Sequence, residues 1–261
     1  GSGKTTIIRL LLGLIKPTAG GIKVFGEDMT LNSANLRNKI GYLPTNPKFP
    51  SKMTPIRYLN FVGKLFGLDR DERMNRLSRL LRAVGLLTSA SREIKDFSTG
   101  MITRLGFAAA LMNDPELLIL DEPTSGLDPL LQQEFESLIF ERKEQGASVI
   151  MSSHIFQEIE SMCDKAGVIR EGEIVSVENV SSLIEKRTFK IEIVFSKPVE
   201  KQFFVNCDGL DIISLKDNKL TCILNGKADS LLKTLAKYEV ISFQSEQAGL
   251  EEMFMSFYPK S

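Results

Sequence analysis

The sequence has 261 residues, 43% of them hydrophobic and 25% charged, and its 33 basic residues balance its 33 acidic ones. This length and composition fit a globular protein with one large domain, or with one medium and one small domain. The balanced charge argues against a protein that coats nucleic acid, and no apolar run is long enough to cross a bilayer. The three cysteines are far apart and lack metal-ligand spacing, so we expect reduced thiols in a cytosolic protein.

The N-terminal part of the sequence predicts a short helix, short strands and then a long helical segment. Residues 1–15 run from a glycine-rich start into an apolar helix, and residues 22–24 and 40–42 alternate as short strands do. Between residue 55 and about residue 87 the pattern becomes helical. One face of this segment carries Met74, Leu77, Leu80, Leu81 and Val84.

Three strand-and-helix units follow. Residues 117–120 form an apolar run, and the helix after it carries Leu130, Leu131, Phe135, Leu138 and Ile139. Residues 148–151 form the second run, before a helix at 155–162, and residues 166–169 form the third, before a turn at 171–173. Apolar strands that alternate with helices indicate a parallel sheet covered on both faces.

The pattern changes after about Lys186. Residues 189–195 alternate strictly between apolar and polar, as in a half-buried strand. Further short strands are predicted at 201–205, 210–215, 219–224 and 240–244. A helix is predicted after Asn225-Gly226, and a last helix carries Leu250, Met253, Phe254 and Phe257. These elements predict a small, separate α+β domain.

The first residues match the end of the phosphate-loop pattern G-x-x-x-x-G-K-[ST]; they are Gly1, Ser2, Gly3, Lys4, Thr5 and Thr6. Gly3 lets the backbone approach an anion, which the N–H groups of the following helix would cradle. Lys4 would reach the β- and γ-phosphates of ATP, and Thr5 would place its hydroxyl on Mg²⁺. Taken alone, a Gly-Ser-Gly start also fits a linker or an expression scar.

The run at 117–120 delivers two acids at its C-terminal end, where open α/β sheets bind ligands. Asp121 suits coordination of Mg²⁺, and Glu122 suits a general base that orients the attacking water. The dipeptide by itself equally fits a strand that ends in solvated acids.

Two further segments and a histidine complete a known order of motifs. Residues 97–101 read Phe-Ser-Thr-Gly-Met before an apolar helix, residues 125–128 read Ser-Gly-Leu-Asp directly after the acids, and His154 follows the next strand. This order resembles the ATPases of ABC transporters. Their signature reads L-S-G-G-Q, of which this chain keeps Ser98 and Gly100. The resemblance implies that His154, the single histidine, is a switch residue that hydrogen-bonds the γ-phosphate.

The resemblance implies an α/β fold of the P-loop NTPase type. The ABC ATPase domain would cover residues 1–180, with a helical subdomain at about 50–105, and a small C-terminal α+β domain would cover 187–261. This last part resembles the domain appended to exporter ATPases of the multidrug, antibiotic and sodium group. The family's leading glycine and supporting strands would precede residue 1, so we expect residues 1–261 alone to bind ATP poorly and to be impaired as an ATPase.

The resemblance also implies partners. Two ATPase subunits are expected to form a homodimer. Each ATP would lie between the phosphate loop of one subunit and the signature residues of the other, which are Ser98, Thr99 and Gly100. Asp128 would bridge the two subunits. ATP and Mg²⁺ would be the ligands, and ATP-dependent closure would drive a separate integral membrane permease. This places the protein in the cytoplasm, peripheral on the inner face of the membrane, and no nucleic acid is expected.

One motif departs from the family. Residues 40–44 normally lead into a glutamine that senses Mg²⁺ and water, but here Thr45 and Asn46 follow. Either could offer an oxygen, or neither touches the metal.

Four arginines recur at three-residue spacing in the helical subdomain: Arg73, Arg76, Arg79 and Arg82. They could dock onto acidic groups near the membrane. The interpretation that we favour is a solvated helix face opposite the apolar stripe.

Three other functions share part of this pattern. A non-transport ABC ATPase acting on ribosomes or DNA usually carries two ATPase halves or a long coiled coil, and neither is seen. A plain P-loop kinase or GTPase would lack the signature, the Ser-Gly-Leu-Asp turn and His154. A binding module without hydrolysis conflicts with the presence of Glu122.

Overall fold

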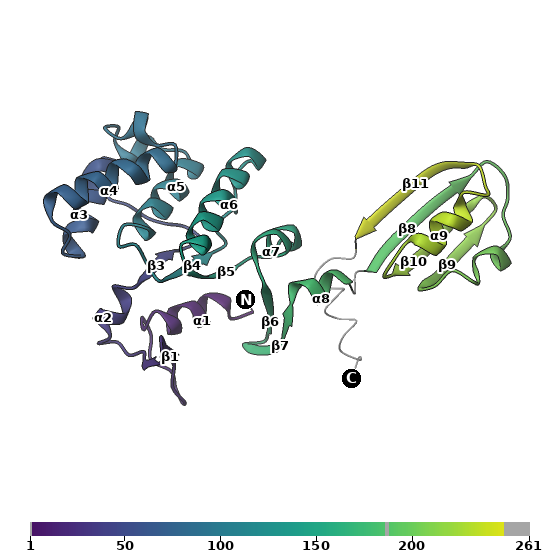
Figure 1. The fold of residues 1–261 in the computed structure, drawn as a ribbon, viewed down its shortest axis with the longest axis horizontal. Coiled ribbons are helices and arrows are strands. Elements are labelled where there is room, and N and C mark those ends of the chain that lie inside the picture. Colours follow the sequence, from purple (N-terminus) through teal and green to yellow (C-terminus); the bar gives the residue numbers. More distant parts are fainter. Residues whose placement is uncertain (1, 186–187, 248–261) are drawn as a thin grey trace. The chain divides into compact units, whose positions relative to one another are not determined.

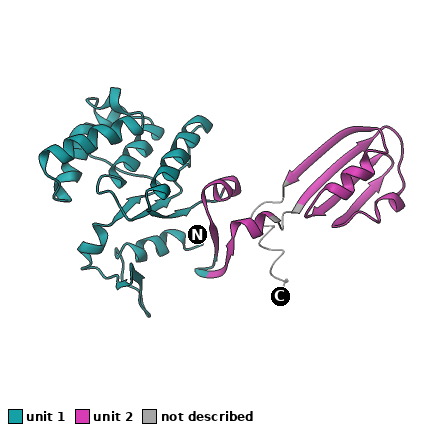
Figure 2. Ribbon diagram, in the orientation of Figure 1, with its two compact units in different colours: residues 1–154, 169–173 teal, residues 155–168, 174–261 magenta. Residues whose placement is uncertain are grey.

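The computed structural model describes residues 2–185 and 188–247. The described residues form two compact units: one holds those up to His154 together with Ile169–Glu173, and the other holds the rest (Figure 2). The predicted last helix, at 250–257, lies outside the described residues. No helix among the described residues is long and apolar enough to cross a membrane.

Three parallel strands form the centre of the first unit. They are β3 (Ile40–Leu43), β4 (Leu117–Asp121) and β5 (Ser148–Ser152), in the order β3-β4-β5. Every residue of β4 is buried, as expected of a strand covered on both faces. The prediction of a parallel sheet from the runs at 117–120 and 148–151 is confirmed.

Helices cover both faces of this sheet (Figure 1). On one side, α1 (Lys4–Leu11) places Ile8 in a cluster with Leu117 and Ile119 of β4. On the other side lie α5 (Thr99–Ala110) and α6 (Pro129–Glu144), whose Phe107 and Phe135 rings are 4.2 Å apart.

The contact between α5 and β3 depends on two glycines. A Cβ atom on Gly41 would collide with the carbonyl oxygen of Ala110 at the end of α5, and one on Gly106 would lie 2.6 Å from Cδ1 of Leu43. Both positions therefore allow the helix to lie closer to the strand than a side chain would permit.

The helical segment after residue 54 is two helices, α3 (Pro55–Leu65) and α4 (Arg70–Ala83). Their first turns are capped by Thr54 and Asp69, whose side chains accept backbone N–H groups. The predicted apolar face is buried except at Met74, which is 44% exposed. The shorter elements of this unit are β1 (Lys23–Val24), β2 (Glu27–Asp28), α2 (Ala34–Arg37), η1 (Leu87–Ser89) and η2 (Ile94–Asp96).

The four arginines do not share one solvated face, so that interpretation is wrong for two of them. Arg73 is half-buried and donates to Asn60 Oδ1 and to the Leu68 carbonyl, each at 2.6 Å. Arg76 donates to the Met112 carbonyl at 3.2 Å. A three-residue step turns about 60° short of a full helical turn, so the three steps that separate the four arginines sweep half the helix surface.

A second correction concerns the third apolar run. The strand β6 (Lys165–Arg170), which follows α7 (Phe156–Met162), pairs with β7 (Glu173–Asn179) instead of joining the parallel sheet. Glu171 and Gly172 connect the two strands with φ angles of 52° and 87°. Two consecutive positive φ angles make a tight reversal that lets a strand pair with its successor.

The strands after α8 (Val180–Glu185) form one four-stranded antiparallel sheet. They are β8 (Thr188–Phe195), β9 (Leu210–Lys216), β10 (Lys219–Asn225) and β11 (Val240–Gln247), in the order β11-β8-β10-β9. The predicted strand at 201–205 is instead the 3-10 helix η3 (Lys201–Phe204). A short apolar run has no decisive period, and here one turn suffices to bury Phe204.

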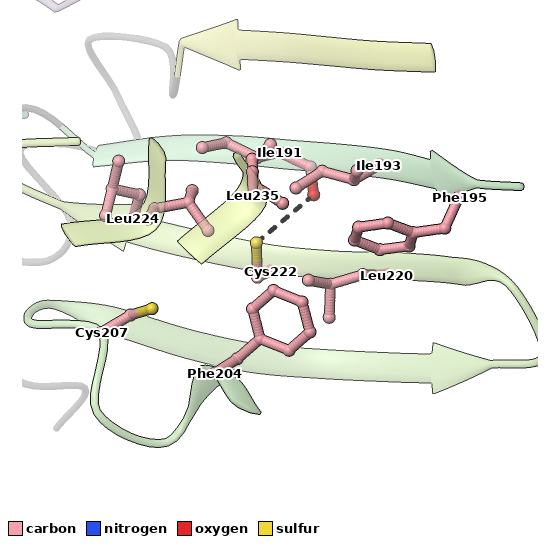
Figure 3. Close-up of a cluster of buried hydrophobic side chains, with 10 residues drawn as sticks. Ile191, Ile193, Phe195, Phe204, Cys207, Leu220, Cys222, Leu224 and Leu235 are labelled. Carbon is pink, nitrogen blue, oxygen red and sulfur yellow. Dashed lines mark hydrogen bonds between the residues drawn. The ribbon is translucent and has the colours of Figure 1, made fainter. Parts of the chain in front are cut away.

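One face of this sheet carries a core cluster of the second unit (Figure 3). Alternate residues of β8 and β10 meet Leu231 and Leu235 of α9 (Asp229–Leu235). The strand residues of this core are Ile191, Ile193, Phe195, Leu220, Cys222 and Leu224. The buried thiol of Cys222 donates to the carbonyl of Ile191, and burial raises its pKa to about 11. None of the three cysteines forms a disulfide.

Candidate nucleotide-binding and catalytic site

The carboxyl ends of the three parallel strands meet at one edge of the sheet. Leu43 lies level with Leu120, and Asp121 lies level with Ser152. Thr45 and His154 therefore come two residues, and Glu122 one residue, after the last paired position of three adjacent strands. Ligands of open α/β sheets bind beyond this edge.

The phosphate-loop residues lie at the N-terminus of α1. Gly3 has a φ of 104° and precedes Lys4, the first residue of the helix. A Cβ atom at Gly3 would lie 3.2 Å from Cα of Gly172, whose N–H donates to the carbonyl of Ser2 at 3.1 Å. Conformation and close approach thus both favour glycine here.

The side chains that follow Gly3 are accessible. Lys4 is half-buried, whereas Thr5 and Thr6 are exposed. The first N–H groups of α1 have no partner inside the helix and favour an anion. Gly1 lies outside the described residues.

Thr5 and Asp121 come together although 116 positions separate them. The hydroxyl of Thr5 donates to Oδ2 of Asp121 at 3.3 Å, and Asp121 is 3% exposed. Hydroxyl and carboxylate oxygens are ligands that Mg²⁺ prefers, so this pair fits the metal expected from the sequence.

Glu122 and His154 also come together. Nδ1 of His154 lies 3.7 Å from Oε2 of Glu122, and both side chains reach solvent. Glu122 has a φ of 50°, a left-handed conformation that costs a non-glycine residue about 1–3 kcal/mol and is common at functional sites.

Ser152 forms hydrogen bonds with both acids, and the sequence motifs did not predict this role. Its hydroxyl donates to Oδ1 of Asp121 at 2.6 Å and accepts the N–H of Glu122 at 3.0 Å. That same N–H lies 3.1 Å from the carbonyl of Ser152. The sequence shows Ser152 as one of two serines before His154, and only the register between β4 and β5 reveals which one meets the acids.

The signature serine and the aspartate after the acids begin neighbouring helices. Ser98 caps α5 by accepting the N–H of Met101, and Asp128 caps α6 by accepting the N–H of Leu131 at 3.0 Å. A Cβ atom on Gly100 would lie 3.4 Å from Cδ1 of Leu131. The packing of α5 against α6 thus brings the signature segment to the residues after the acids. Ser98, Thr99 and Asp128 are exposed.

The positions where the family has its glutamine follow β3. Thr45 is half-buried and Asn46 is exposed. Tyr42, in the same strand, has a raised pKa because of burial and then the charge of Asp121, which Arg9 partly opposes. Its phenol is therefore neutral at physiological pH.

Comparisons with known proteins show which proteins this chain resembles. A family model described as "ABC transporter" matches residues 1–125. The linearmycin resistance ATP-binding protein LnrL of Bacillus subtilis is 31% identical over 98% of this chain and 86% of its own length. The bacitracin transport ATP-binding protein BcrA of Bacillus licheniformis is 43% identical over 67% of this chain and 56% of its own.

A solved structure of an ATP-binding subunit of an ABC transporter has the same fold. It superposes with a TM-score of 0.65 at 29% identity, over 70% of this chain and 76% of that one. The chain spans just over half the length of several curated relatives that it matches, such as BcrA. The predicted ABC ATPase fold is confirmed, and the chain belongs to the ATP-binding proteins of the ABC transporter family.

Proposed function

We propose that this chain is the ATP-binding and ATP-hydrolysing part of an ABC transporter of the exporter type. The observation that carries the proposal is the joint placement of two pairs, Thr5 with Asp121 and Glu122 with His154, at one edge of the sheet. Relatives named for bacitracin transport and linearmycin resistance support the exporter assignment.

Phosphate binding would begin at α1. The backbone after Gly3 offers N–H groups to the phosphate oxygens, and Lys4 adds a positive charge beside them. Because Thr5 is exposed, its hydroxyl can turn from Asp121 to a metal ion that accompanies ATP.

Thr5 and Asp121 would hold Mg²⁺, which supplies charge neutralisation on the phosphates when it is bound. Thr45 or Asn46 would stand in for the family's glutamine in the same region. In this role the burial of Asp121 keeps its carboxylate from competing water, and the hydrogen bond from Ser152 fixes its orientation.

Glu122 would accept hydrogen bonds from the attacking water and orient it, and His154 would donate to the γ-phosphate. The contact between their side chains supports this division because it holds Glu122 and His154 on one side of the site. The positive φ of Glu122 turns the chain sharply where the strand ends.

A second subunit would complete the site. Ser98, Thr99 and Gly100 start α5, whose N-terminus favours an anion, and the exposed side chains of Ser98 and Thr99 leave it open to the ATP of a partner. Asp128 would bridge the subunits. We propose a homodimer that acts on a separate integral membrane permease at the cytoplasmic face of the membrane.

ATP binding tests this function directly. In the full-length protein, Lys4→Ala should abolish ATP binding, measured by calorimetry, and ATPase activity with it. Lys16→Ala, at an exposed lysine beyond α1, should leave both unchanged. Equal ATP affinity in the Lys4 variant and the wild type would rule out the phosphate-loop assignment.

Transport is tested by association. The full-length protein should co-purify with a multi-span membrane protein, and its ATPase rate should change when that partner is present. Consistent recovery with ribosomes would instead favour a non-transport ABC ATPase.

A further inference from the structure

One buried hydroxyl connects the two acids of the candidate site. Ser152 is 8% exposed and ends β5, level with Asp121 at the end of β4. Its hydroxyl donates to Asp121 Oδ1 at 2.6 Å and accepts the N–H of Glu122 at 3.0 Å. A serine hydroxyl has one proton to donate, and here that proton goes to the buried carboxylate.

These contacts form a continuous chain across the site. Thr5 donates to one oxygen of Asp121, Ser152 donates to the other, and the same Ser152 oxygen accepts the backbone N–H of Glu122. Each carboxylate oxygen of Asp121 thus accepts a hydrogen bond from a different hydroxyl. A short hydrogen bond from a hydroxyl to a carboxylate is among the stronger and more directional contacts in proteins.

The conformation of Glu122 adds a second, independent observation. Its φ of 50° is unfavourable for a residue with a side chain, so it needs support from its neighbours. Its N–H finds that support at both oxygens of Ser152, the carbonyl at 3.1 Å and the hydroxyl at 3.0 Å. Loss of the hydroxyl would remove one acceptor and leave the direction of the Glu122 side chain less defined.

We propose that Ser152 is a positioning residue for ATP hydrolysis. Its hydroxyl fixes the orientation of the metal-binding carboxylate of Asp121 and the backbone conformation of the base Glu122. This inference rests on the proposed function. In this role Ser152 acts through the two acids, which its hydroxyl contacts directly. Loss of its hydroxyl should therefore lower kcat and raise the Mg²⁺ requirement while leaving phosphate-loop binding of ATP in place.

The test is a matched pair of substitutions in the full-length protein, Ser152→Val and Ser152→Thr. Valine and threonine have the same shape, and only threonine keeps a hydroxyl. The Val variant should lose about 10- to 100-fold in kcat, as supporting residues of metal sites commonly do, and should need more Mg²⁺ for half-maximal rate. The Thr variant should restore most of the rate. The KM for ATP, and the affinity for ATP without Mg²⁺, should stay close to the wild type in both.

Two controls separate positioning from folding. Ser148→Ala, at the exposed start of the same strand, should not change kcat. Ser152→Ala, which introduces no added methyl group, should match Ser152→Val in kcat and remain folded at the assay temperature. Equal losses in the Thr and Val variants, or an Ala variant with wild-type kcat, would overturn the inference. A wild-type protein with no ATPase activity would instead overturn the proposed function on which it rests.

Discussion

The two sheets of this protein place their polar residues differently. The parallel strand β4 is buried at all five positions because helices cover both faces of its sheet. In the antiparallel strand β10 of the second unit, buried residues alternate with more exposed ones, because α9 covers a single face. When helices cover both faces of a sheet, polar functional side chains lie at the ends of its strands. When one face is uncovered, polar side chains lie along that face.

The cores differ in the same way. Asp121 and Ser152 are buried polar residues of the first unit, and they bond to one another. The core cluster on the antiparallel sheet of the second unit contains apolar residues and two cysteines. Substitutions at the strand ends of the first unit should therefore change rates, whereas substitutions in the second core should change stability. Four predictions can break or sharpen this contrast.

The largest effect is expected at Glu122. Glu122→Gln in the full-length protein should lower the ATPase rate by about 10²- to 10⁴-fold, because glutamine cannot take a proton from the water. ATP binding should persist and trap an ATP-bound dimer, measurable by size-exclusion chromatography. Glu116→Gln, an exposed acid just before the same strand, is the matched control. Normal turnover in the Glu122 variant would show that another group is the base.

The core of the second unit should respond in stability alone. Phe204 is 1% exposed, so Phe204→Ala should cost about 3–5 kcal/mol in the free energy of unfolding of this unit, followed by denaturant titration. Phe203→Ala removes the neighbouring ring, which is 48% exposed, and should cost much less. A fall in ATPase rate, at temperatures where the variant is folded, would contradict the separation of roles.

Overpacking at the contact between α5 and β3 should destabilise the first unit. Gly41→Ala places a methyl group against the carbonyl of Ala110 and should cost about 1–3 kcal/mol in the free energy of unfolding. Gly21→Ala introduces a methyl group with no atom within 4 Å and is the control. Equal stability of the two variants would mean that the helix can move away from the strand freely.

The smallest effect is a pH dependence from Cys222. Burial raises the pKa of its thiol from 9.0 to about 11, so the folded state keeps this proton after the unfolded state has lost it. The protonated thiol of Cys222 therefore contributes fully to the free energy of unfolding below about pH 9, and this contribution declines as the pH rises towards 11. Denaturant titrations at pH 8 and pH 10 should show this loss in the wild type and less of it in Cys222→Ala. An identical loss in both proteins would assign the pH effect to other groups.

Local patterns in the sequence were sufficient for several features. The unbroken apolar run at 117–120 predicted a strand buried on both faces, and the alternation at 189–195 predicted a strand with one buried face. The order of motifs predicted the family, which the relatives confirm. These features depend on residues close together in the chain, or on their order along it.

The contacts that build the site depended on the tertiary structure. Thr5 meets Asp121 across 116 positions, and Ser152 meets it across 31. The local pattern likewise did not predict that β6 pairs with β7 or that Arg73 donates a hydrogen bond to Asn60. Periodicity tells which face of an element is apolar, but the register between strands decides which polar atoms meet, because it is set by packing over the whole unit. The order of the motifs thus predicted both acids, whereas the contact of Ser152 with them became visible only from the register of β4 with β5.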